Sequence, residues 1–360
     1  MPPLPNAIHK HVYSRYHDKK AFPQPQRYGI TGQQRRVSND ADWSCWEYSR
    51  YKEETKEQSQ SGIEGKVADD AETLVSGSIR ELHTTVIAGS SNLKPSEEKS
   101  RSEPVLIFFH GNGDPHYRLK CISEILQQKD TTILFPDYRG HSLIQPEIQM
   151  DTLVVSEDSK NSSVAKKDIR PNERVLTQDM HHMLLMLPIW YPNRPWAVYG
   201  ISQGSGVAMN FLESASQAGL LHNVTGLILD SPFASLAHAA SFLASKQKGC
   251  IGRIPKGLTR MISSCLLKVY DEQYNNVRKM QRLRHGEDGV KFPVLLFAAL
   301  QDDITDPGDC DILREAAGRL ATVVSLDTAH GSCMDSGEIY YKHLIGFLNK
   351  CEKSLHSSSQ

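Results

Sequence analysis

The stretch Trp196–Gly206 reads WAVYGISQGSG and surrounds Ser202 with three glycines at the end of an apolar run. A buried strand accounts for Ala197, Val198 and Tyr199, but it gives no reason for glycines so close together. In a Gly-x-Ser-x-Gly turn between a strand and a helix, small neighbours let the two elements approach, and the serine stands on a sharp, strained turn. The stretch therefore predicts a serine hydroxyl exposed at a helix N-terminus, where the helix dipole and free N–H groups stabilise an oxyanion.

Further apolar runs lie on both sides of this stretch, and helical patterns separate several of them. The runs end at Phe109, Phe135, Tyr199, Asp230 and Leu300, and an earlier strand is expected over Leu82–Ala88. Short continuous apolar runs are typical of strands that are buried on both faces, as in parallel sheets. Helical stretches such as Arg118–Gln127 and Gln178–Met186 lie between them. This alternation predicts an α/β fold with a mostly parallel, twisted sheet and helices on both faces.

The chain of 360 residues divides by composition into an arm, a domain and a tail. Residues 1–65 are polar and proline-punctuated, and we predict a flexible N-terminal arm there. Residues 66–352 hold the apolar runs and are predicted to form one domain, with a short tail over 353–360. Within the domain we predict a polar surface insertion over 143–173 and a helical cap region over 233–289.

The predicted cap contains one amphipathic helix. Its apolar residues recur at helical spacing and are Leu258, Met261, Ile262, Cys265, Leu266 and Val269. Such a stripe usually faces a core, so we expect this helix to pack over the sheet as part of a lid. Contact of the stripe with a membrane is the alternative.

The charge and the cysteine content of the chain indicate which classes of partner and which compartment fit the protein. The chain has 41 basic and 42 acidic residues, so no overall field favours nucleic acid, and a neutral, small or apolar substrate fits better. Its seven cysteines form no Cys-x-x-Cys pair, which favours reduced thiols in the cytoplasm over disulfides or a zinc site. The opening residues lack the apolar core of a signal peptide, and no apolar run approaches the roughly 20 residues of a membrane span. The basic residues up to Arg36 predict either an arm that touches an anionic membrane or a solvated tail.

Polar residues that suit nucleophilic catalysis follow the predicted strands. A serine hydroxyl needs a base and a carboxylate that fixes the tautomer of that base. Asp302 follows the strand that ends at Leu300, and His330 follows the last predicted strand. The order Ser, Asp, His is the one expected behind a nucleophile elbow. Asp303 and Asp230 remain alternatives for the acid, because the register after Leu300 is ambiguous and some hydrolases take the acid from the preceding strand.

The same edge of the sheet offers two donors for an oxyanion. His-Gly-Asn at 110–112 follows the run that ends at Phe109, so the backbone N–H of Asn112 is predicted as one donor. The backbone N–H of Gln203, at the start of the predicted helix, is the other. No metal or organic cofactor is needed for this chemistry.

The words FFHGNG, PDYRGHS, GISQGS, GLILDSPFAS and AHGS give the chain, from about Glu72 to Lys350, a resemblance to the α/β-hydrolase superfamily. The same motifs resemble those of serine hydrolases near the BEM46-like and ABHD12/13-like branch. The resemblance implies an α/β-hydrolase fold with a small helical cap. These relatives often carry a membrane anchor, for which this chain shows no segment. AALQDD stands where relatives usually have His-Gly-x-x-Asp, and alignment on that pattern makes Asp302 the acid.

The resemblance also implies supporting roles. In the superfamily the histidine at the position of His110 usually supports the oxyanion loop. Cys333 is expected to be a bystander, since Ser202 already occupies the elbow. Four residues of PDYRGHS are expected to fix the loop after their strand, and they are Asp137, Tyr138, Arg139 and His141.

Together these features predict a serine hydrolase that acts on a carboxylic ester or thioester of a lipid-like or small acyl substrate through an acyl-enzyme. Three alternatives stay open: a peptidase or amidase of the prolyl-oligopeptidase type, an acyltransferase on the same fold, and a non-catalytic scaffold.

Overall fold

The computed structural model describes residues 30–36, 44–50, 103–112, 115–129, 131–138, 172–246, 255–269, 273–285 and 291–357. In this part of the chain eight strands form one sheet in the order β1-β2-β4-β3-β5-β6-β7-β8. The strands are β1 Ile30–Arg36, β2 Ser44–Arg50, β3 Val105–Phe109, β4 Thr132–Asp137, β5 Trp196–Ile201, β6 Val224–Asp230, β7 Val294–Ala299 and β8 Ala321–Leu326. Strands β3 to β8 run parallel, as the continuous apolar runs predict.

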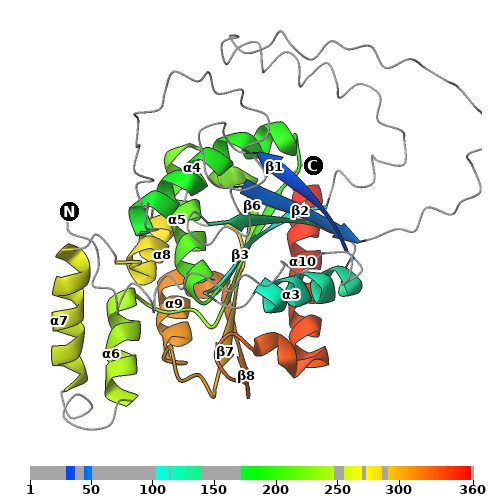
Figure 1. Cartoon of the computed structure of the whole chain (residues 1–360). Coiled ribbons are helices and arrows are strands. Elements are labelled where there is room, and N and C mark those ends of the chain that lie inside the picture. The colour runs from blue at the N-terminus through cyan, green and yellow to red at the C-terminus, as the bar shows by residue number, and fades with distance from the viewer. Residues whose placement is uncertain are drawn as a thin grey trace, which may run out of the picture.

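Helices cover both faces of this sheet (Figure 1). The α-helices are α3 Pro115–Gln128, α4 Glu173–Trp190, α5 Gln203–Gln217, α6 Leu236–Lys246, α7 Lys256–Val269, α8 Asn276–His285, α9 Asp309–Ala317 and α10 Glu338–Ser357. Short 3-10 helices span Leu221–Asn223, Gly318–Leu320 and Cys333–Ser336. No helix in the described part of the chain is long and apolar enough to cross a bilayer.

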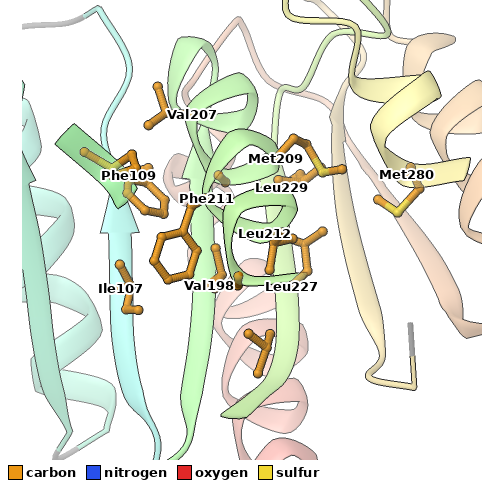
Figure 2. Packing of buried hydrophobic residues seen from close by; sticks show 14 of the residues in the cluster. Ile107, Phe109, Val198, Val207, Met209, Phe211, Leu212, Leu227, Leu229 and Met280 are labelled. Carbon is orange, nitrogen blue, oxygen red and sulfur yellow. The ribbon is translucent and has the colours of Figure 1, made fainter. Parts of the chain in front are cut away.

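The two faces follow from the alternation of side chains along each strand. In β3, Ile107 and Phe109 belong to a core that β5 and β6 share with α4, α5, α8 and α9. Leu106 and Phe108 point the other way, into a second core that α3 and α10 close. Figure 2 shows Ile107 and Phe109 beside Phe211 of α5, and the rings of Phe109 and Phe211 have their centroids 5.5 Å apart. Burial on both faces requires the near-continuous apolar runs seen in the sequence.

The first two strands correct the prediction of a flexible arm over 1–65. β1 pairs with β2, and β2 pairs antiparallel with β4, with Trp46 opposite Phe135 in the register. Antiparallel strands at the edge of a sheet need no continuous apolar run, so a polar sequence concealed them. The rest of 1–65 lies outside the described residues, as do Leu82–Ala88 and nearly all of 143–173. The predicted tail over 353–360 is also corrected, because α10 continues to Ser357.

The predicted cap region divides into two parts. α8 packs against α5 and α9, and its Met280 and Leu283 are buried in the first core, so α8 belongs to the body of the fold. α6 and α7 come between β6 and β7 in the chain and pack on each other as a helical hairpin, with α7 on the outer side of α6 in Figure 1.

The expectation that the α7 stripe packs over the sheet is wrong. Leu258, Met261 and Ile262 are 44%, 58% and 46% exposed, and Cys265 is exposed as well. The side chains of Leu266 and Val269 lie outside the described residues. The helix forms as its periodicity predicts, but the four exposed residues face outward, and α7 contacts α6 through the side that carries Thr259.

Candidate active site

Ser202 stands between β5 and α5 on a turn with a positive φ of 52°. Two close approaches make this turn possible. A Cβ atom on Gly200 would lie 2.5 Å from the carbonyl oxygen of Gly204, and one on Gly204 would collide with the carbonyl oxygen of Phe109. Positive φ is costly for a residue with a side chain and clusters at functional sites. Gly200 and Gly204 thus allow α5 to pack closely on β5 and on the end of β3.

The hydroxyl of Ser202 forms a hydrogen bond with His330, which lies on the turn after β8. Ser202 Oγ and His330 Nε2 are 2.7 Å apart, although the two residues are separated by 128 positions in the chain. On the far side of the turn, the backbone N–H of Gly331 donates to Ser231 Oγ at 3.0 Å. The imidazole therefore lies within reach of the serine proton, with its loop tied to the end of β6.

Asp302 lies on the opposite side of the imidazole. Its Oδ2 is 2.6 Å from His330 Nδ1 and also accepts from Thr305 Oγ1 at 2.8 Å. Its Oδ1 accepts from the backbone N–H groups of Ile304 and Thr305, at 2.8 and 2.7 Å. Burial alone raises the pKa of this carboxyl, but the hydrogen bond and the electrostatic attraction of His330, together with the donors of Thr305, outweigh burial and hold the pKa below its ordinary value. Asp302 is thus an ionised acceptor for the imidazole.

The two predicted oxyanion donors belong to segments that meet at Ser202. Gln203 is the first residue of α5, so the helix itself cannot pair its backbone N–H. Asn112 follows Gly111, which packs so closely on the elbow that a Cβ there would lie 3.1 Å from Ser202 Cβ. The turn after β3 and the start of α5 therefore flank the serine from two directions.

His110 supports the turn after β3, in agreement with its expected structural role. It is fully buried, and its ring stacks on Tyr138 with centroids 3.9 Å apart. Its Nδ1 is 2.7 Å from the carbonyl oxygen of Gly111, and Tyr138 Oη donates to the carbonyl oxygen of His110 at 3.0 Å. These contacts hold the ring against the turn and Tyr138. The side chain of Asp137 lies outside the described residues, as do Arg139 and His141.

Comparison with solved structures finds matches to the fold at low sequence identity. The chain is similar to the esterase Pf2001 of Pyrococcus furiosus, with 11% identity and a TM-score of 0.53 over 94% of this chain and 98% of that chain. It is also similar to an α/β hydrolase from Vibrio vulnificus, with 14% identity and a TM-score of 0.54 over 96% of this chain and 94% of that chain. The chain has the α/β-hydrolase fold. No protein-family model matches the sequence, and no curated protein matches it either.

Asp230, the alternative acid, has a different environment within the α/β-hydrolase fold. It is fully buried, and it accepts from Tyr199 Oη at 3.0 Å and from Ser231 Oγ at 2.9 Å. Burial raises its pKa above the ordinary value, although hydrogen bonds from Cys333, Ser231 and Tyr199 act against the shift. The other alternative, Asp303, is exposed beside the buried Asp302. The carboxylate that bonds the imidazole is that of Asp302.

Cys333 lies near the site but is poorly suited to nucleophilic chemistry. It is fully buried, and burial next to Asp230 raises the pKa of its thiol far above the ordinary value. Among the described residues, no group of three or more His, Cys, Asp and Glu side chains comes together to hold a metal ion.

Thr305 and Ser231 are contributors that sequence reasoning missed. Thr305 gives Asp302 two donors, and Ser231 holds the loop of His330. The first left only an indirect signal, since an Asp side chain often accepts from the backbone two residues on, which here is the N–H of Ile304 beside Thr305. The second left none, because its partner Gly331 is 100 positions away.

Proposed function

We propose that the protein is a serine hydrolase that cleaves a carboxylic ester or thioester through an acyl-enzyme. One observation carries the proposal: Ser202 Oγ, His330 and Asp302 form a continuous hydrogen-bonded chain at the N-terminus of α5. The combination of a strained serine, a bonded imidazole and an ionised carboxylate is the arrangement that activates a hydroxyl. The likeness to a structure of an esterase supports the same reaction class.

In the acylation step, Ser202 Oγ attacks the substrate carbonyl while its proton passes to His330 Nε2. Asp302 accepts from His330 Nδ1, which keeps Nε2 free of a proton before the attack and stabilises the imidazolium afterwards. The backbone N–H groups of Gln203 and Asn112 donate to the oxyanion of the tetrahedral intermediate. The imidazolium then gives its proton to the departing alkoxide or thiolate, and the acyl group stays on Ser202.

In the deacylation step, water takes the place of the leaving group. His330 Nε2 accepts a proton from water as the oxygen attacks the acyl carbonyl, and it returns that proton to Ser202 Oγ when the acid leaves. An amine or alcohol in place of water would give acyl transfer, and an amide substrate would use the same steps.

We further propose that the substrate is a small or lipid-like acyl compound and that the protein works in the cytoplasm, near the BEM46-like branch in ancestry. Support for a reducing compartment comes from cysteines that remain free thiols, among them Cys121, Cys265, Cys310, Cys333 and Cys351.

Labelling with a fluorophosphonate tests the nucleophile without knowledge of the substrate. We expect the wild type to gain one covalent adduct, which peptide mass mapping assigns to Ser202, and Ser202→Ala to gain none. Ser214→Ala is the matched control, since Ser214 is a buried serine of the same helix, and it should label as the wild type does. An adduct that persists in folded Ser202→Ala would assign the nucleophile to another residue.

A further inference from the structure

The outer face of α7 is an apolar surface that the described part of the chain leaves uncovered. Leu258, Met261, Ile262 and Cys265 recur at the spacing i, i+3, i+4, i+7, so they share one side of the helix. Each of the four is exposed, and Met261, at 58%, is more exposed than Leu258 and Ile262. We refer to these four residues as the α7 face.

The inner side of α7 is already occupied. Thr259 is only 7% exposed, and its hydroxyl bonds that of Ser241 on α6 at 2.8 Å. α6 is the described element against which α7 packs extensively, and Figure 1 shows α7 on the outer side of this pair. The α7 face is therefore not needed to hold the hairpin together.

The segment that carries the α7 face has a one-sided charge. Between Ser231 and Tyr270 there is no acidic residue, so all 42 acidic residues of the chain lie elsewhere. The segment holds six basic residues, and these are Lys246, Lys248, Arg253, Lys256, Arg260 and Lys268. Lys246 and Arg260 are exposed, and neither forms an ion pair with another residue of the described ranges. The segment that carries the α7 face thus has a net positive charge, on a chain that is otherwise slightly acidic.

We propose that the α6–α7 hairpin docks on an anionic lipid surface. An amphipathic helix with exposed apolar residues and unpaired basic residues binds at the boundary of headgroups and acyl chains, where both kinds of side chain find partners. The α7 face enters that boundary, and the net positive charge of the segment, to which the exposed Lys246 and Arg260 contribute, attracts the lipid phosphates. A second copy of this chain fits less well, because pairing two such faces would bring two all-basic segments together. The docking does not depend on catalysis by Ser202.

Vesicle flotation of the full chain tests this docking. We expect the wild type to float with vesicles of phosphatidylcholine and phosphatidylserine, and to float much less with phosphatidylcholine alone or at about 0.5 M NaCl, which screens the charges. Met261→Ser/Ile262→Ser should lower the partition coefficient by about tenfold or more, because it removes apolar area from the boundary. Ser202→Ala should float as the wild type does, so a failure of docking is distinct from a failure of the proposed hydrolase.

The matched control replaces two equally exposed apolar residues on other helices. Leu185→Ser/Ile339→Ser removes side chains that are 50% and 58% exposed on α4 and α10, and its binding should equal that of the wild type. Because Met261 and Ile262 are exposed, their replacement should leave the thermal unfolding midpoint unchanged. Undiminished flotation of the Met261→Ser/Ile262→Ser variant would overturn the proposal and assign any contact to another segment, such as the basic stretch up to Arg36. Sedimentation that shows a wild-type dimer, dissociated by the same variant, would overturn it in favour of a second copy.

Discussion

Asp230 ends β6 and Asp302 follows the neighbouring parallel strand β7, so both lie at the same edge of the sheet, yet their surroundings shift their pKa values in opposite directions. Asp230 is fully buried among Tyr199 and Ser231, and burial raises its pKa. Asp302 receives three donors from its own loop and one from His330, and its pKa is lowered despite burial. The two aspartates at one edge of the sheet thus differ in the pKa of their carboxyl groups, because different hydrogen-bond donors surround each of them.

The largest expected effect separates the two carboxylates by activity. If the protein is a serine hydrolase, Asp302→Asn should lower kcat for a p-nitrophenyl ester by about 10⁴-fold, because His330 loses the acceptor that fixes its tautomer. Asp230→Asn and the exposed control Asp303→Asn should change kcat by less than about tenfold. Steady-state rates of the three variants test which aspartate is the acid partner of His330, and circular dichroism checks that each variant is folded. A greater loss in Asp230→Asn would reverse the assignment of the acid.

The strands before the two aspartates were predictable from the sequence, whereas the roles of the aspartates were not. Apolar runs that end in Asp230 and near Asp302 predicted both strands, because strands buried on both faces carry that pattern in any parallel sheet. The choice between Asp302 and Asp303 could not be made from the sequence, since it depends on which side chain turns inward to meet the N–H groups of Ile304 and Thr305. Periodicity also predicted α7, but it says only that a helix has an apolar side and not what covers that side.

The second expected effect is that the carboxyls of Asp230 and Asp302 change the free energy of unfolding with pH in opposite directions. A carboxyl with a lowered folded pKa stabilises the fold above its unfolded pKa of about 4, and this contribution is lost as the pH falls through the folded pKa. A carboxyl with a raised folded pKa destabilises the fold progressively as the pH rises above about 4. Relative to the wild type, Asp230→Asn should therefore gain unfolding free energy from pH 4 to pH 7, whereas Asp302→Asn should gain it only as the pH falls below about 4.

Urea unfolding of the two variants and the wild type across this pH range measures the effect. Asp303→Asn serves as the reference for loss of an exposed carboxylate. Curves for Asp230→Asn that run parallel to the wild type at all pH values would show that Asp230 titrates normally and would contradict a raised pKa for this carboxyl.

The smallest expected effect concerns the tyrosines beside Asp230. Tyr340 Oη is 2.6 Å from Tyr199 Oη, which in turn donates to Asp230. Tyr340→Phe removes one buried hydrogen bond and should cost about 1 kcal/mol of unfolding free energy, with kcat/KM changed by less than about twofold. Tyr341→Phe is the control, because its hydroxyl bonds Glu124 instead. A large loss of activity in Tyr340→Phe alone would mean that the Asp230 cluster takes part in catalysis.

The imidazole of His330 lies between the hydroxyl of Ser202 and the carboxylate of Asp302. Proton NMR tests this pairing most directly, since an imidazole N–H that donates to a carboxylate resonates far downfield, and its absence in His330→Gln assigns the signal. We predict that this resonance persists in Asp230→Asn and disappears or moves upfield in Asp302→Asn. A resonance that survives in Asp302→Asn and is lost in Asp230→Asn would contradict the pairing.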